Sequence, residues 1–170
     1  MTRLLAIDPG TYIMGLALFE GPDLVDTQSL EPAPHARHSV ETRLAWLMAE
    51  LTARVRGWGI EAIAMERPGA SNPAHRPASL LTLCTFIRQK AKREWHIPLT
   101  PYATGTITKA VAPRGWPGDR KEKLRAGVVA LYGESYGLRL QHAPQDVIDA
   151  IAVGHCHLCK IREKELLEHG

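Results

Sequence analysis

The fold is decided by the stretch LLAIDPGT at residues 4–11, in which an apolar run ends in an acid and a turn. Residues 4–8 predict a buried strand, and Pro9-Gly10-Thr11 predicts a turn directly behind it. An acid that ends a buried strand is costly to bury unless a cation meets it. Asp8 is therefore a candidate functional residue, although an Asp before Pro-Gly can also simply stabilise the turn.

Further strands and helices follow outward from this stretch. Two more strands, 14–21 and 24–30, are separated by Gly21-Pro22-Asp23, which indicates an antiparallel meander. Strands at 60–66 and 97–102 then alternate with amphipathic helices at 40–55 and 78–95, and with loops at 67–77 and 112–118. A short helix at 104–111, a helix that ends at Gly133 and a last helix behind Pro144 complete the pattern. The order predicts an α/β fold, a mixed five-stranded sheet flanked by helices.

Composition limits the class of protein. The chain has 170 residues and is 45% hydrophobic, which predicts a single domain over residues 1–170. No apolar run approaches the ~20 residues that a membrane span needs, and residues 1–10 do not form a signal peptide. Three cysteines do not make a disulfide framework, so we expect a cytoplasmic protein. A net charge of +3 is compatible with nucleic acid without establishing it.

Three further acids are candidate functional residues. Glu66 also ends a short apolar strand, and Asp146 and Asp149 lie three residues apart on the last helix, where they face the same way. Simpler interpretations exist: Glu66 could pair with Arg67, and Asp146 could interact favourably with the helix N-terminus. Carboxylates brought together repel one another unless a metal neutralises them, and hard oxygen ligands suit Mg²⁺ or Mn²⁺. Paired ions of this kind act on phosphodiesters, which predicts a metal-dependent nuclease.

A second group of possible ligands, His155, Cys156, His157 and Cys159, does not predict a zinc site. Consecutive side chains on one helix diverge, whereas a structural zinc site needs four convergent ligands. Cys156 and Cys159 are better interpreted as small core residues.

The motifs AIDPGTYIMGLAL, AMERPG, TITKAV with the basic helix after it, and QDVIDAIAVGHCH occur in this order over nearly the whole chain. In this arrangement the chain resembles the RuvC-like Holliday junction resolvases of the ribonuclease H-like superfamily. The stretch TITKAVAPRGWPGDRKEKL looks more like the phage or plasmid branch, in which case the location would be the host cytoplasm. The resemblance implies a homodimer that cuts a four-way DNA junction by paired symmetric nicks, without a small-molecule cofactor.

The resemblance also implies roles for particular residues. Asp8, Glu66, Asp146 and Asp149 would hold two divalent ions, Mg²⁺ or Mn²⁺. Lys109 would lie near the scissile phosphate, and Lys121, or Arg120 one residue earlier, would be the second cation. Contact with DNA is further expected from residues of the loop at 112–118 and the basic helix behind it. The predicted DNA-binding residues are Lys109, Arg114, Trp116, Arg120, Lys121 and Lys123.

One departure from the resemblance bears on the substrate. Related cellular enzymes carry an aromatic residue soon after the second acid, whereas here none follows Glu66 until Phe86. The range of branched DNA therefore stays open at this point. The sequence also leaves three other functions open. These are an RNA-processing nuclease of the same superfamily, a non-catalytic branched-DNA-binding protein and, less compatible with the length, a fragment of a sugar or acetate kinase. For the homodimer, the helix at 78–95 is the candidate interface.

Overall fold

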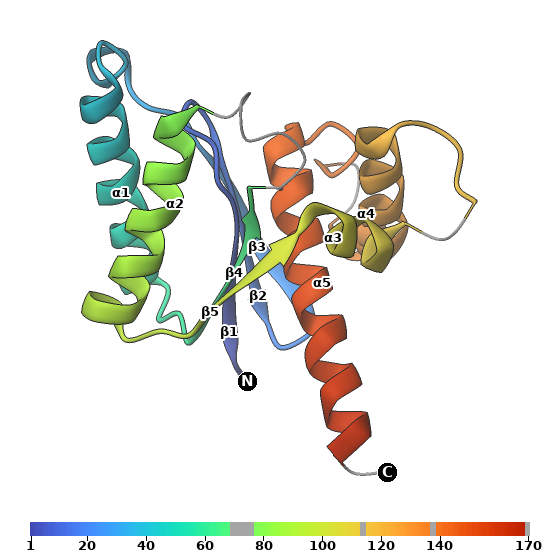
Figure 1. The fold of residues 1–170 in the computed structure, drawn as a ribbon. Coiled ribbons are helices and arrows are strands. Elements are labelled where there is room, and N and C mark those ends of the chain that lie inside the picture. Colours follow the sequence, from blue (N-terminus) through green and yellow to red (C-terminus); the bar gives the residue numbers. More distant parts are fainter. Residues whose placement is uncertain (69–76, 113–114, 137–138, 169–170) are drawn as a thin grey trace.

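The computed structural model describes residues 1–68, 77–112, 115–136 and 139–168. Its centre is a five-stranded mixed sheet in the order β3-β2-β1-β4-β5 (Figure 1). The strands β1, β2 and β3 pair in antiparallel fashion, whereas β4 and β5 add to the other side of β1 in parallel. The mixed five-stranded sheet predicted from the sequence is thus confirmed. The strands are β1 (Arg3–Asp8), β2 (Met14–Glu20), β3 (Asp23–Leu30), β4 (Ala62–Arg67) and β5 (Leu99–Ala103).

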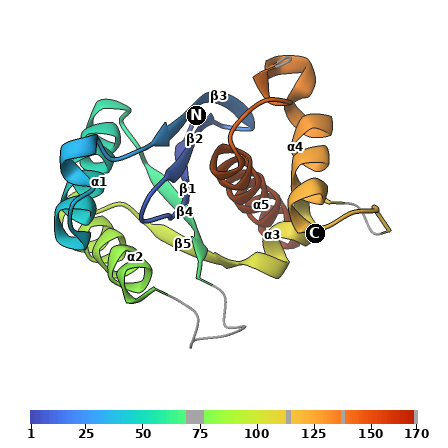
Figure 2. The same cartoon turned by 90° about the horizontal axis from the view of Figure 1, so that it is seen from above.

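Helices cover both faces of the sheet. Seen from above, α1 and α2 lie on one side, and α3, α4 and α5 lie on the other (Figure 2). Because side chains alternate along a strand, Leu5 and Ile7 of β1 pack in the core under α1 and α2, whereas Leu4 and Ala6 pack in the core under α5. The helices are α1 (Val40–Gly57), α2 (Ala78–Lys90), α3 (Thr104–Val111), α4 (Arg120–Tyr136) and α5 (Gln145–Glu168), with a short 3₁₀ helix at Pro34–Ala36.

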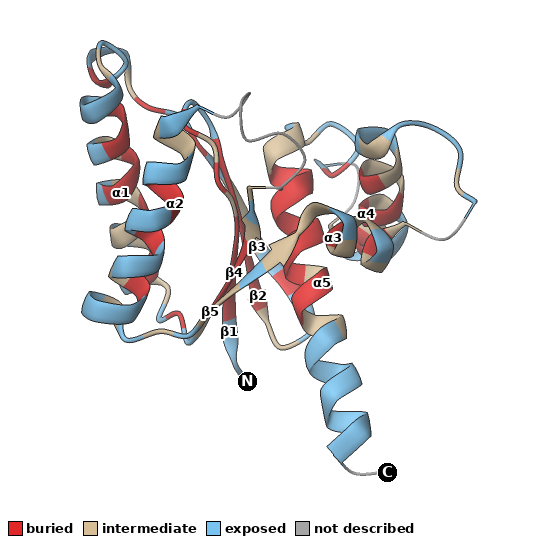
Figure 3. Ribbon diagram, in the orientation of Figure 1, coloured by how far each residue is buried: buried red, intermediate tan, exposed pale blue. Residues whose placement is uncertain are grey.

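Helix α5 packs against β1, β2 and β4, and two glycines of this chain allow its close approach. A Cβ at Gly15 of β2 would lie 1.9 Å from the backbone oxygen of Asp146, and a Cβ at Gly154 would lie 2.1 Å from the ring of Phe19. The first half of α5 is therefore buried against the sheet, whereas its last turns are exposed (Figure 3).

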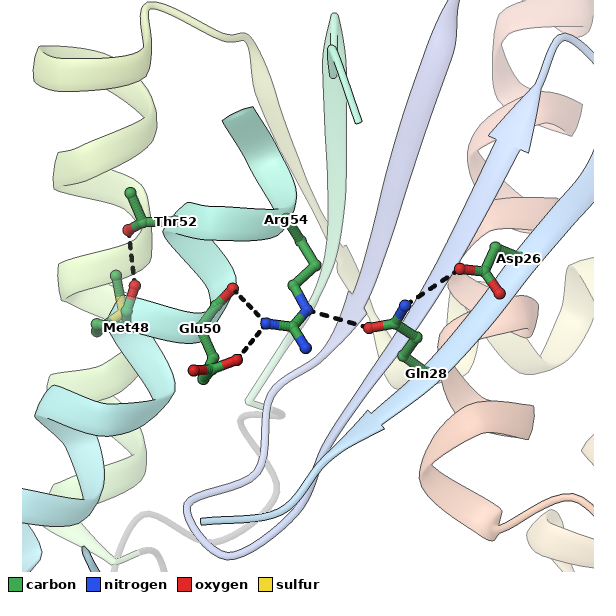
Figure 4. A network of polar contacts seen from close by, with 6 residues as sticks. All are labelled: Asp26, Gln28, Met48, Glu50, Thr52 and Arg54. Carbon is green, nitrogen blue, oxygen red and sulfur yellow. Dashed lines mark hydrogen bonds and ion pairs between the residues drawn. The ribbon is translucent and has the colours of Figure 1, made fainter. Parts of the chain in front are cut away.

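Helix α1 is joined to the outer strand β3 by a polar network (Figure 4). The Arg54 guanidinium donates to Gln28 Oε1 at 3.1 Å and pairs with Glu50 one turn earlier. The Gln28 amide in turn donates to Asp26 at 3.2 Å. These contacts hold α1 against β3, the outer strand of the antiparallel half of the sheet.

Two helix boundaries differ from the prediction. The helix expected to end at Gly133 continues to Tyr136. A glycine ends a helix when it adopts a left-handed conformation, and Gly133 is not among the residues with positive φ. The helix expected at 78–95 is α-helical to Lys90, turns once more as a π-helix over Ala91–Trp95, and ends at His96 with φ of 55°. In the described residues, no helix is long and apolar enough to cross a membrane.

Candidate active site

The register of the sheet brings the first two acids together. In the parallel pair of β1 and β4, Ala6 lies opposite Ala64 and Ile7 opposite Met65. Continuing this register by one residue places Asp8, the last residue of β1, beside Glu66, the residue before the end of β4. Both share the orientation of Ala6 and Ala64, whose side chains pack in the core on the α5 side. The two carboxylates therefore project toward the α5 face of the sheet. The carboxyl ends of β1 and β4 lie at the edge where α5 begins (Figure 1).

The first turns of α5 supply the other two acids. Asp149 is only 8% exposed and lines one pocket with Asp8, Glu66 and Arg120, a hollow of about 250 Å³. Asp146 does not line this pocket, although its charge acts on Asp8. Three of the predicted acids thus meet in one hollow, and the fourth lies beside it.

Hydrogen bonds orient three of the four carboxylates. Thr104, the first residue of α3, donates to Glu66 at 2.5 Å, because β5 pairs in parallel with β4 and ends at the same edge. Gln145 donates to Asp149 at 3.0 Å, one helical turn away. Ser29 of β3 donates to Asp146 at 2.5 Å, which draws this carboxylate toward the outer strand.

These partners were not foreseen from the sequence. The spacing of Gln145 and Asp149, four residues apart on a helix, is the one local signal that could have indicated a contact. Thr104 and Ser29 are 38 and 117 residues from their partners, so only the sheet order identifies them.

Arg125 supports the same arrangement from α4. Its guanidinium donates to Gln145 Oε1 at 3.2 Å and to the backbone oxygen of Ala143 at 2.9 Å. It also lies 3.3 Å from the Gln141 oxygen, in the segment that leads into α5. Arg125, Gln145 and Asp149 therefore form a chain of hydrogen bonds that fixes the last acid.

Asp8 has a different environment from the other acids. No side chain in the described part of the protein donates a hydrogen bond to its carboxylate. Burial, followed by the charges of Asp149 and Glu66, raises the pKa of Asp8 to about 8. Burial also raises the pKa of Asp149, against the lowering effect of the Gln145 hydrogen bond. The pocket thus carries negative charge that the protein compensates only in part.

This donor set fits a hard divalent cation in its chemistry. Carboxylate oxygens are the ligands that Mg²⁺ and Mn²⁺ prefer, and a cation would relieve the repulsion that raises the pKa of Asp8. Within the described ranges, however, no three His, Cys, Asp or Glu side chains already converge closely enough to form a metal centre. In this structure Asp146 contacts Ser29, and Glu66 contacts Arg120.

Of the predicted basic residues, Arg120 is the one that lines the pocket. Its Nη2 lies 3.2 Å from Glu66 Oε2, so the partner of Glu66 is Arg120 and not the neighbouring Arg67. Lys121 is exposed but close enough for its charge to lower the pKa of Asp149. The other predicted DNA contacts do not line the pocket: Lys109 is exposed on α3, Trp116 and Lys123 are half-buried, and Arg114 lies outside the described residues.

The His and Cys residues of α5 diverge, as predicted. His155 contacts the Tyr132 hydroxyl of α4 at 2.8 Å, whereas His157 contacts the Tyr102 hydroxyl of β5 at 2.9 Å. Cys156 is buried in the core, while Cys159 is half-buried and lies 3.4 Å from His155. These side chains do not belong to the pocket of acids.

Known proteins resemble the chain over nearly its full length. Crossover junction endodeoxyribonuclease RuvC of Dehalococcoides mccartyi is 29% identical over 161 residues, which cover 91% of this chain and 90% of the relative. The enzyme of the same name from Halorhodospira halophila is 28% identical, with 92% and 90% of the two chains covered. No protein-family model matches the chain.

Solved structures agree on the fold. Thermus thermophilus RuvC superimposes with a TM-score of 0.74 at 20% identity, covering 96% of this chain and 97% of the other. The same protein in complex with a Holliday junction substrate gives a TM-score of 0.72 at 19% identity, with 96% of each chain covered. The yeast mitochondrial Holliday junction resolvase gives 0.60 at 13% identity, over 92% of this chain and 78% of its own.

Proposed function

We infer that this chain is a crossover junction endodeoxyribonuclease. It resembles the RuvC Holliday junction resolvases both in sequence and in structure. It cuts branched DNA, above all four-way junctions, by hydrolysis of phosphodiester bonds in paired symmetric nicks. The observation that carries the proposal is the meeting of Asp8, Glu66 and Asp149 in one pocket at the edge of the sheet. Residues 1–170 act as one nuclease unit in the cytoplasm, without a small-molecule cofactor.

Use of a divalent metal follows from this class of nuclease, and we propose two ions per site, Mg²⁺ or Mn²⁺. Asp8, Glu66, Asp146 and Asp149 would hold them. When bound, such ions activate water and stabilise the leaving oxygen of a phosphodiester. To hold an ion, the Asp146 side chain would have to turn away from Ser29, which donates to it in this structure.

The protein's own residues do the remaining work. Thr104 orients Glu66, and Gln145, itself held by Arg125, orients Asp149. Positioning of this kind fixes the reacting groups before substrate arrives. Arg120 and Lys121 offset the negative charge that develops on the phosphate, and Lys109 contacts it from α3. Arg114, Trp116 and Lys123 extend the binding surface along the DNA.

A cleavage assay with variants of the acids tests this function. Labelled four-way, three-way and linear DNA are incubated with the protein, with and without Mg²⁺. We expect Mg²⁺-dependent cutting of the four-way junction, and its loss in Asp8→Asn, Glu66→Gln and Asp146→Asn. Junction binding by these variants should stay close to wild type or become tighter, because an amide keeps the shape of the acid and lowers its repulsion of phosphate. Wild-type cleavage by Asp8→Asn would disprove the assignment of the site.

Paired nicks require two sites at a fixed separation, so we propose a homodimer related by a two-fold axis. Helix α2 is the proposed interface. Leu83, Cys84 and Ile87 are buried in the protomer's own core, but Phe86 is 44% exposed and lines an apolar groove between α1 and α2. Light scattering at micromolar concentration measures the stoichiometry. A monomer both free and on the junction would exclude cutting by a preformed dimer.

A further inference from the structure

Arg120 combines features that an ordinary surface ion pair lacks. Its guanidinium meets both oxygens of Glu66, at 3.2 and 3.4 Å from Nη2, and lines the pocket with Asp8 and Asp149. Its side chain is 36% exposed, whereas that of Glu66 is only 14% exposed. Its Nε is buried without a hydrogen-bond partner among the described residues. The guanidinium is therefore held in the pocket by charge more than by a complete set of hydrogen bonds.

The position of Arg120 on its helix is also unfavourable. It is the first residue of α4, where the helix dipole disfavours a cation. Asp119 and Glu122 lie at the same helix end and cap each other's backbone N–H groups. The acids of the pocket add to this compensation, and the charge of Arg120 opposes the rise in the pKa of Asp8 and of Asp149. A guanidinium cannot release its proton in the physiological range, so its charge can leave the pocket only if the side chain moves.

A divalent cation in this pocket would need the Glu66 oxygens that Arg120 now contacts. Two like charges on one carboxylate repel each other, and the cation carries the larger charge. We propose that Arg120 is a built-in counter-ion: it stabilises the carboxylate cluster before a metal ion binds, is displaced from Glu66 by the ion, and then contacts a DNA phosphate. The last step rests on the proposed nuclease function, whereas the first two concern the protein alone.

Metal binding to the protein without DNA tests the first two steps. The affinity for Mn²⁺ is measured by calorimetry on wild type, Arg120→Ala and the control Arg56→Ala, which removes the same side chain from an exposed position on α1, outside the pocket. We expect Arg120→Ala to bind the ion on the order of tenfold more tightly, because the competing charge is gone. The control should change by less than about twofold. Unchanged or weaker binding by Arg120→Ala overturns the proposal.

DNA binding tests the third step. Affinity for the four-way junction is measured in EDTA and in Ca²⁺, an oxygen-binding ion used here as the probe. If Arg120 reaches phosphate only after displacement, Arg120→Ala should bind like wild type in EDTA and several-fold more weakly in Ca²⁺, with a salt slope smaller by about one unit. An equal loss in both conditions overturns the displacement step. Tighter metal binding together with slower cleavage in one variant is a result that a purely structural role does not produce.

Two further measurements separate a folding defect from a change in metal binding, and a failure of the nuclease proposal from a failure of the Arg120 proposal. If Arg120→Ala is unfolded by circular dichroism, the same measurements are made on Arg120→Met, which keeps the apolar stem of the side chain. If the wild-type protein cuts no DNA substrate, the proposed function fails, but the metal titration still decides whether Arg120 competes with the ion.

Discussion

Asp8 is the residue at which the stability of the fold and the proposed binding of a metal ion oppose each other most directly. Its carboxylate is surrounded by other acids and has no hydrogen-bond donor among the described residues, so ionisation in the folded protein is unfavourable. The metal-free protein should therefore be least stable at the pH at which a nuclease needs Asp8 charged. Such a conflict is typical of functional sites.

The conflict gives a measurable pH dependence. The ordinary pKa of Asp is 3.8, and that of Asp8 in the folded protein is about 8. Between these values the folded state holds a proton that the unfolded state has lost, so the contribution of Asp8 to stability falls as pH rises. Asp8→Asn has no such proton. In EDTA, its advantage over wild type should grow between pH 5 and 7, by up to about 1.4 kcal/mol per pH unit, and vanish below pH 4.

Urea unfolding at a series of pH values measures this difference. Glu61→Gln is a suitable control, because Glu61 is exposed and accepts a hydrogen bond from the backbone of Arg3, away from the pocket. Parallel stability curves for wild type and Asp8→Asn would contradict the raised pKa.

Gln145 is expected to matter through Asp149. Removing its amide in Gln145→Ala frees the carboxylate that this amide orients at 3.0 Å. Loss of a residue that orients a metal ligand costs about 10- to 100-fold in metal affinity or activity. Cleavage should fall within that range, whereas the exposed neighbour Gln141, as Gln141→Ala, should keep wild-type rates. Equal rates for the two variants in a single-turnover assay would show that Asp149 needs no such support.

At the scale of elements, the placement of α5 depends on two glycines with different consequences. A Cβ at Gly15 would collide with the backbone at Asp146, and a Cβ at Gly154 would collide with Phe19 in the core. Gly15→Ala should therefore shift the first turn of α5 and its acids, whereas Gly154→Ala strains the middle of the helix.

We expect both variants to lose stability, by about 1–3 kcal/mol, as overpacked sites do. At a temperature where both are fully folded, cleavage by Gly15→Ala should fall at least about tenfold, because an ångström of misplacement is costly in an active site. Gly154→Ala should retain most of its activity. Thermal melts and cleavage rates on the same samples separate the two effects, and equal losses of activity would mean that α5 moves as a rigid body.

The sequence predicted the elements that carry strong local signals. Apolar runs that end in acids predicted β1 and β4, and the spacing of Asp146 and Asp149 predicted one helical face. Gly133 was misinterpreted, because a glycine ends a helix only through a left-handed conformation that tertiary packing decides. The contacts of Thr104 and Ser29, and the pairing of Arg120 with Glu66, could not be predicted, because each depends on which segments lie side by side. The separation of Asp146 from the pocket depends on the position of β3 in the same way.

For the whole molecule, the exposed part of α2 predicts an effect on assembly. Phe86 lines the groove between α1 and α2 without filling the protomer's core. Phe86→Glu should weaken the proposed dimer at least about tenfold, because it places a charge in an apolar contact. The melting temperature of the protomer should stay nearly unchanged. Leu167→Glu is a matched control at the exposed end of α5. A Phe86→Glu dimer as tight as wild type, measured by sedimentation, would place the interface elsewhere.

The contribution of α5 also has a consequence for synthesis of the protein. This helix provides Asp146 and Asp149 and covers the sheet face on which Asp8 and Glu66 project, yet it follows all the strands along the chain. On the ribosome, the five strands and α1 to α4 emerge before it does. A nascent chain that stops short of α5 has two of the four acids and an exposed apolar sheet. If the four acids act together as proposed, the order of elements leaves an unfinished chain without a complete site. Its exposed apolar sheet would make it a target for chaperones and proteases.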